Sequence, residues 1–208
     1  MLLTSSIFLS FQVIQKIEIL ANYLIFNSRV GKEEISLENW NFDESKSTWS
    51  NPEIPLEFVL PKEMTFFKPS NLSMKDKTGT GQIAGVIASS SKDPNRYPCI
   101  RIFYLPSFVI ETEFDMVREM RSYLDFLVNQ GEIEEIKDLG DLEFKEKNLP
   151  GRFWSFYDVM RPRIARTGFY LYPLGNGARL ILHITENEVK TSVHEESILA
   201  ILLSLKSQ

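Results

Sequence analysis

Two histidines and one cysteine are the residues of this chain best suited to nucleophilic or metal chemistry. Cys99 lies in the strand-like run 98–102, where we expect a buried and unreactive thiol, because a reactive thiol needs a lowered pKa and no neighbour in the sequence supplies one. His183 and His194 fall in different predicted elements, a separation that does not predict a zinc site. These residues therefore predict no catalytic residue, no cofactor and no metal.

Carboxylates gather between residues 132 and 146. They are Glu132, Glu134, Glu135, Asp138, Asp141, Glu143 and Glu146. Paired carboxylates can serve as a general acid and a general base. Here, however, they alternate with apolar residues such as Ile133 and Leu142, as charges on the solvated face of a sheet do. We therefore interpret them as surface charges.

Arg161, Arg163 and Arg166 form the one basic cluster of a chain whose net charge is −5. Guanidinium groups bind carboxylates and phosphates well, and loops between strands often carry binding residues. We therefore take the three arginines as the candidate binding residues for a protein partner, with an ordinary solvated loop as the alternative. The acidic balance argues against a nucleic-acid partner, because nucleic-acid binding normally requires a basic surface.

Alternation of apolar residues predicts the strands that must position these side chains. The predicted strands span residues 56–60, 64–68, 82–89, 99–105, 132–139, 142–147, 152–160, 167–172 and 178–185. The first two are predicted to pair as a hairpin across Pro61-Lys62-Glu63. Glycine-containing turns separate the later strands, and connections this short permit only antiparallel neighbours.

Apolar residues spaced three and four apart predict two amphipathic helices. The first carries Phe114, Val117, Met120, Leu124, Leu127 and Val128 and ends at Gly131. The second begins at a capping box of Ser192 and Glu195 and carries Ile198, Ile201, Leu202 and Leu205. Strands followed by a helix, more strands and a final helix predict an α+β fold, an antiparallel meandering β-sheet flanked by helices.

The N-terminal part of the chain is predicted to lie outside this fold. Residues 1–30 are apolar but interrupted by polar side chains, which leaves three interpretations open: the remnant of a secretory signal, a helix packed on the domain, or a membrane anchor. Residues 31–51 have the composition of an acidic linker. The domain is therefore expected to span residues 52–208 and to fold alone, with any membrane association confined to residues 2–26.

Several segments together resemble a known superfamily. They are the strand and turn 58–64, the helix 115–128, the strand 180–185 and the helix 198–205, which ends in a hydrophobic-Ser-hydrophobic step. In order and texture they are similar to the α/β/α sandwich shared by PsbP of photosystem II, the nuclear Ran-release factor, and bacterial envelope proteins of the DcrB and LpqN kind. The resemblance spans about residues 52–206 and implies an accessory or adaptor protein without catalytic residues.

Two functional hypotheses follow from these observations. The first is a non-enzymatic binding or accessory module of the bacterial cell envelope that acts through a protein partner. The alternative is a small-ligand-binding protein, or a carboxylate-dependent enzyme, with a pocket between the sheet and a helix. A pocket with convergent polar groups would favour the alternative.

Overall fold

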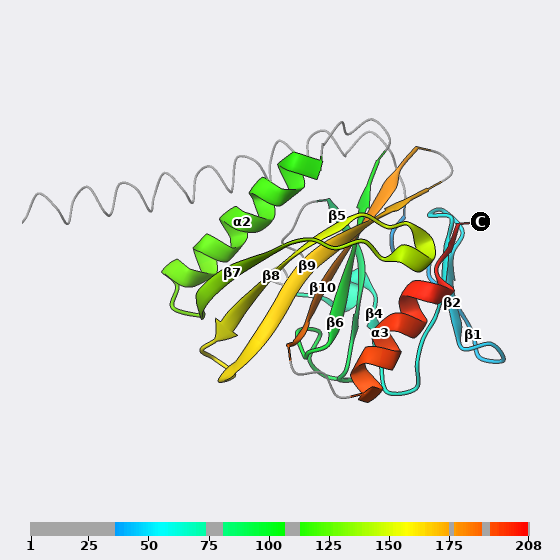
Figure 1. Cartoon of the computed structure of the whole chain (residues 1–208). Coiled ribbons are helices and arrows are strands. Elements are labelled where there is room, and N and C mark those ends of the chain that lie inside the picture. Colours follow the sequence, from blue (N-terminus) through cyan, green and yellow to red (C-terminus); the bar gives the residue numbers. More distant parts are fainter. Residues whose placement is uncertain (1–35, 74–80, 107–112, 175–176, 189–191, 208) are drawn as a thin grey trace, which may run out of the picture. The chain divides into compact units, whose positions relative to one another are not determined.

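Strands form two antiparallel sheets in the part of the chain that the computed structural model describes, residues 36–73, 81–106, 113–174, 177–188 and 192–207. The larger sheet has the strand order β4-β5-β6-β10-β9-β8-β7, and the smaller has the order β1-β2-β3-β11. Figure 1 shows helix α2 along one face of the larger sheet, with helix α3 and the smaller sheet on the other. The predicted α+β fold with an antiparallel sheet flanked by helices is therefore confirmed.

The larger sheet is a meander over most of its width. Its strands are β4 (Thr65–Phe67), β5 (Gln82–Ala88), β6 (Cys99–Leu105), β7 (Ile133–Asp141), β8 (Gly151–Asp158), β9 (Arg163–Pro173) and β10 (Arg179–Asn187). From β7 to β10, strands that follow one another in the chain pair directly, as their short connections require. β10 then pairs with β6, so the last strand of this sheet lies at its centre.

Two predicted elements differ from the structure. The predicted hairpin of residues 56–60 and 64–68 is wrong, because β3 (Leu56–Val59) pairs with β2 in the smaller sheet and β4 pairs with β5 in the larger. The predicted strand 142–147 is a 3-10 turn, η2 (Lys145–Lys147), closed by a bridge between Phe144 and Leu149. In the first case each strand pairs with a strand other than its neighbour across the turn. In the second case a tight local turn forms although the apolar residues alternate.

The smaller sheet contains residues that the sequence assigned to a linker. It consists of β1 (Asn41–Asp43), β2 (Thr48–Asn51), β3 and β11 (Lys206–Ser207). Trp40 is 3% exposed, and its indole nitrogen donates a 2.9 Å hydrogen bond to the carbonyl of Ala84. The prediction of a linker is therefore wrong for residues 36–51. Exposed acidic side chains dominate the composition of this segment and conceal the signal of its buried aromatic residue, Trp40.

Both predicted helices are present, as α2 (Glu113–Asn129) and α3 (Ser192–Ser204). Leu124 on α2 is fully buried, and Gly131 follows that helix with a φ of +70°, the left-handed conformation that suits glycine. Val128 is 40% exposed, so its place in the predicted apolar stripe is wrong. The side chains of the predicted capping box, Ser192 and Glu195, lie outside the described residues.

The apolar side chains of α3 face the sheet as predicted. Ile198, Ile201 and Leu202 are buried in α3, and Leu205 is buried just beyond its end. None of the described helices has the length and apolar character needed to cross a membrane. The predictions for residues 1–30 concern a segment outside the described residues and stay predictions.

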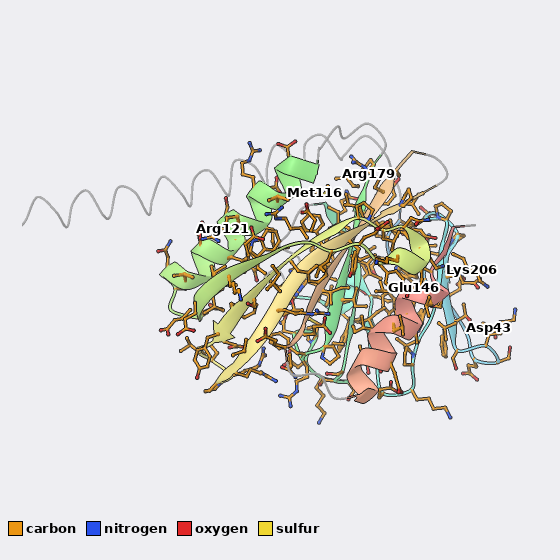
Figure 2. All side chains as sticks on the ribbon, viewed as in Figure 1. Asp43, Met116, Arg121, Glu146, Arg179 and Lys206 are labelled. Atoms are coloured by element: carbon orange, nitrogen blue, oxygen red, sulfur yellow. The ribbon has the colours of Figure 1, made fainter. Side chains whose placement is uncertain are left out.

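The larger sheet separates two hydrophobic cores. Along β9, Ala165 and Phe169 face the core beneath α2, while Tyr170 and Tyr172 face the core shared by α3 and the smaller sheet. Figure 2 marks the two sides with Arg121 on α2 and Lys206 on β11 of the smaller sheet. Since side chains alternate along a strand, residues an odd number of positions apart in β9 lie on opposite faces of the molecule.

Candidate functional site

The three arginines of the basic cluster belong to the β8–β9 hairpin. Arg161 lies in the turn 159–162, and Arg163 and Arg166 lie in β9. Arg163 and Arg166 are three positions apart, so Arg163 lies on the α2 face and Arg166 on the α3 face. The pleat of the strand therefore divides the cluster into two separate environments.

Backbone hydrogen bonds hold the turn of this hairpin in place. The N–H of Arg161 donates to Asp158 Oδ1 at 2.9 Å, and the N–H of Val159 donates to the carbonyl of Glu132 at 3.0 Å. Asp158 is only 3% exposed and pairs with Arg163 across the two strands. The turn is therefore a defined structure with a buried carboxylate at its base.

Tyr97 supports two of the arginines on the α2 face. The guanidinium carbons of Arg161 and Arg163 lie 5.2 Å and 5.0 Å from the centre of the Tyr97 ring, within the range of a cation–π contact. Burial, followed by the negative charge of Asp158, raises the pKa of the Tyr97 phenol. The ring therefore stays neutral and its face remains attractive to both cations.

Polar partners complete the positioning of these two side chains. Arg161 Nη2 lies 3.4 Å from Asp93 Oδ2, and Arg163 Nη1 donates to Asn187 Oδ1 at 2.9 Å. The side chain of Arg161 nevertheless remains 33% exposed. The hairpin thus presents guanidinium groups whose positions are set before any partner arrives.

The same hairpin exposes large apolar side chains. Met160 in the turn is 73% exposed and Ile164 at the start of β9 is 52% exposed, the two highest values among the large apolar residues that the structure describes. Met160 therefore adds an exposed apolar side chain next to Arg161 in the turn, and methionine is enriched in protein interfaces. We call Met160, Arg161 and Arg163, with Tyr97 beneath the two arginines, the hairpin tip. Ile164 follows Arg163 in β9 and therefore lies on the α3 face.

Arg166 occupies a different site, on the α3 face. Its guanidinium nitrogens Nε and Nη2 both contact Oε1 of Glu186 on β10, and its guanidinium carbon lies 5.6 Å from the centre of the Phe153 ring. The side chain of Glu186 is 4% exposed and that of Arg166 is 27% exposed. This ion pair is therefore largely removed from solvent.

A pocket of about 180 Å³ opens beside this ion pair, between α3 and the larger sheet. Arg166, Tyr170 and Glu186 line it, together with the apolar residues Phe144, Phe153, Ile184, Ile198, Leu199 and Leu202. Burial raises the pKa of the Tyr170 phenol, while the charge of Arg166 lowers it and the charge of Glu186 raises it. The phenol is therefore neutral and lies within the influence of both charged groups.

A second group of polar side chains is buried beneath α2. His183 Nε2 lies 2.8 Å from Thr167 Oγ1, which lies 3.0 Å from Thr185 Oγ1, and Cys99 pairs with Thr185 across the strands. Burial raises the pKa of the Cys99 thiol, and burial followed by the charge of Arg101 lowers the pKa of His183 to about 3. Both groups are therefore neutral, the reverse of the thiolate and imidazolium that a cysteine nucleophile uses.

The buried imidazole of His183 should make the protein less stable in acid. Its pKa is lowered in the folded state, so the unfolded state takes up the proton first as the pH falls below about 6.5. Stability due to this group is complete above that pH and is lost down to about pH 3, the pKa in the folded state. Urea unfolding across this range should show a pH slope reduced in His183→Gln, by up to about 1.4 kcal/mol per pH unit. Equal slopes in the two proteins would contradict a buried neutral imidazole.

The acidic segment 132–146 is a solvated strand edge, as the sequence indicated. Six of its seven carboxylates are exposed, and Glu132 is partly buried. Asp138 and Asp141 both accept hydrogen bonds from Arg152, at 2.7 Å and 2.8 Å, and the bond from Arg152 lowers the pKa of Asp138. The Asp138 carboxylate is thus held ionised and oriented by an arginine, the reverse of what a general acid requires.

Metal ligands do not converge in the described part of the chain, where no group of three or more His, Cys, Asp or Glu could hold an ion. The side chain of His194, the second histidine of the chain, lies outside the described residues. Tyr97, Met160 and Glu186 were missed from the sequence. The signal for Glu186 was present, because it continues the buried alternation of Leu182 and Ile184 on the core face of β10.

No protein-family model and no curated protein sequence matches this chain. The structure is similar to the solution structure of cyanobacterial PsbP (CyanoP) from Synechocystis sp. PCC 6803, with 12% identity, a TM-score of 0.45, and coverage of 85% of this chain and 96% of that one. It is also similar to the Ran-binding protein Mog1p of Saccharomyces cerevisiae, with 10% identity, a TM-score of 0.40, and coverage of 74% and 90%. At these identities the likeness concerns the fold alone.

Proposed function

We propose that this protein is a non-enzymatic binding module and that the hairpin tip is its contact site for an acidic protein partner. The observation that carries the proposal is the stacking of Arg161 and Arg163 on Tyr97 beside the exposed side chain of Met160. Tyrosine, arginine and methionine are enriched in protein interfaces, and arginine and tyrosine often dominate the binding energy.

Preorganisation favours the tip as a binding surface. Immobilising a long side chain on binding costs roughly 0.5–1.5 kcal/mol. Part of that cost is already met for Arg161 and Arg163, because Tyr97, Asp93 and Asn187 fix their orientations in the free protein. Their guanidinium groups would pair with carboxylates of the partner, while Met160 would enter an apolar depression on it. Arg166, the third arginine of the cluster, belongs to the opposite face and takes no part in this contact.

Several features support binding over catalysis. Cys99 and His183 are buried and neutral, and the acidic residues near β7 are engaged with Arg152 or exposed to solvent. A location in the bacterial cell envelope remains part of the proposal, and it rests on the apolar character of residues 2–26. Sequencing the N-terminus of the protein isolated from its natural source would test that location.

Photo-crosslinking tests the contact site. A photoreactive amino acid at Met160 in the full chain, produced in its natural host, should give an adduct of defined mass whose partner is identified by mass spectrometry. Replacing Arg161 and Arg163 together by alanine should weaken binding of the purified partner by at least about tenfold, the loss expected for a pair of interface arginines. Added salt should weaken the wild-type complex, because exposed charges are screened beyond about 8 Å at physiological ionic strength.

Leu142 provides the matched control. It is 36% exposed on the connection between β7 and β8, outside the hairpin tip. The photoreactive amino acid at this position should leave the partner uncrosslinked. A partner that crosslinks equally from both positions, or that binds the double arginine variant with unchanged affinity, would show that the hairpin tip is not the contact site.

A further inference from the structure

We infer that the pocket between α3 and the larger sheet binds a small neutral molecule with a benzene-sized apolar body and one hydrogen-bond acceptor. This site is separate from the hairpin tip, because it lies on the α3 face and is lined by Arg166 instead of Arg161 and Arg163. Ligand binding in the pocket can therefore be tested independently of the proposed protein partner.

The size and walls of the pocket define the apolar body of the ligand. The volume of about 180 Å³ is close to that of an engineered apolar cavity, about 150 Å³, that accepts benzene. Phe144 and Phe153 provide aromatic surfaces on the sheet side, and Ile198, Leu199 and Leu202 provide aliphatic surfaces on α3. A ring or a short branched chain would fill this space, whereas a larger ligand would extend through the open side.

Arg166 supplies the polar contact. Its Nε and Nη2 are engaged by Glu186, whereas its Nη1 has no hydrogen-bond partner among the described residues and is not a buried atom. Tyr170 also lines the pocket, and no described residue forms a hydrogen bond with its hydroxyl group. One carbonyl or amide oxygen of a ligand can therefore accept from these two donors at one end of an otherwise apolar site.

The ion pair favours a neutral ligand over an anion. The positive charge of Arg166 is already balanced by Glu186, whose side chain is 4% exposed. A bound carboxylate would add an unbalanced negative charge near Glu186 and would lose its hydration, which costs several kcal/mol per buried ion. A carbonyl group makes the same contact with Arg166 without that cost.

Benzamide is the probe for this site, and benzoate is the matched charged probe. Titration of the full chain with benzamide, followed by ¹H–¹⁵N correlation NMR, should give saturable shifts confined to α3, β8, β9, β10, and Phe144 with the turn η2 that follows it. The Kd should be on the order of 1 mM, as expected for a fragment of this size. Benzoate should bind at least about fivefold more weakly, a difference of about 1 kcal/mol. Tighter binding of benzoate would overturn the neutral head group, and shifts spread over other strands would overturn the site.

Two tryptophan substitutions on α3 separate this pocket from the rest of the helix. Leu199 lines the pocket at its open side and is 38% exposed, while Leu203, one turn later, is 44% exposed and does not line it. Leu199→Trp should abolish the benzamide shifts, and Leu203→Trp should leave them unchanged, with thermal melts showing that both variants are folded. Binding retained in Leu199→Trp, or lost equally in both variants, would overturn the inference. If Leu199→Trp does not fold, the location of the wild-type shifts decides it.

Discussion

A fragment that begins at Pro52 should fail to unfold cooperatively, whereas a fragment that begins at Ser36 should melt in a single transition. The shorter fragment lacks β1, β2 and Trp40, and it leaves β3 without its partner on one side. Removing a buried tryptophan side chain alone costs about 3–5 kcal/mol. That loss is a large part of the 5–15 kcal/mol that stabilises a typical domain, and exposure of Leu56 and Phe58, both fully buried, adds to it.

Circular dichroism melts and urea titrations of the two fragments measure this difference. Trp40→Ala in the full chain tests the same contact without truncation and should lower the free energy of unfolding by about 3–5 kcal/mol. Trp40→Phe is the matched control, because it keeps an aromatic ring against Phe58 and Phe66 and loses only the hydrogen bond to Ala84 and part of the ring. A sharp transition for the fragment 52–208, close to that of 36–208, would show that the domain begins at Pro52 after all.

Replacing Arg166 by methionine should destabilise the protein by about 3–5 kcal/mol, the cost of breaking a buried ion pair on one side. Methionine keeps most of the apolar stem of arginine but removes both contacts of the guanidinium with Glu186. The carboxylate of Glu186 is then left buried with its principal counter-charge gone. Urea unfolding at neutral pH, analysed with a common slope, measures the loss.

The double variant Arg166→Met/Glu186→Leu distinguishes two causes of this destabilisation. One is the loss of the attraction between Arg166 and Glu186, and the other is the unpaired charge that Glu186 keeps in the single variant. Replacing both members of a buried pair by apolar residues of similar volume is often neutral or stabilising, by about 1–4 kcal/mol. The double variant should therefore be more stable than Arg166→Met, although it carries one substitution more. A single variant within about 0.5 kcal/mol of wild type, the range typical of surface changes, would show that the pair is solvated.

Local patterns in the sequence predicted the elements that carry their own signal. The alternation of β5, β6, β8 and β10 and the three-and-four spacing of α2 and α3 are properties of consecutive residues, so they are visible without any long-range contact. Apart from β3, the smaller sheet was not visible in this way. β1 and β2 are three and four residues long, and β11, which closes that sheet on β3, is two residues long.

The candidate sites were only partly accessible from the sequence for a related reason. The arginine cluster was identified, but the predicted strands 152–160 and 167–172 left a loop between them, whereas β9 begins at Arg163. Once Arg163 is in a strand, the pleat alone places Arg163 and Arg166 on opposite faces. Tyr97 lies 64 residues before Arg161 in the chain, so no local sequence pattern could predict that its ring contacts the arginines of the hairpin tip.

By itself, then, the sequence determined the α+β class, the antiparallel order of the later strands, the two amphipathic helices and the absence of any local catalytic motif. Only the tertiary structure decided that β1 and β2 join the smaller sheet and that Arg161 and Arg163 share the Tyr97 ring while Arg166 lies on the opposite face. It also decided where a pocket forms beside the ion pair of Arg166 and Glu186. The physical reason is that periodicity reports which face of an element avoids water. Which other helix or strand that apolar face packs against depends on the pairing of strands and the packing of side chains from all parts of the chain.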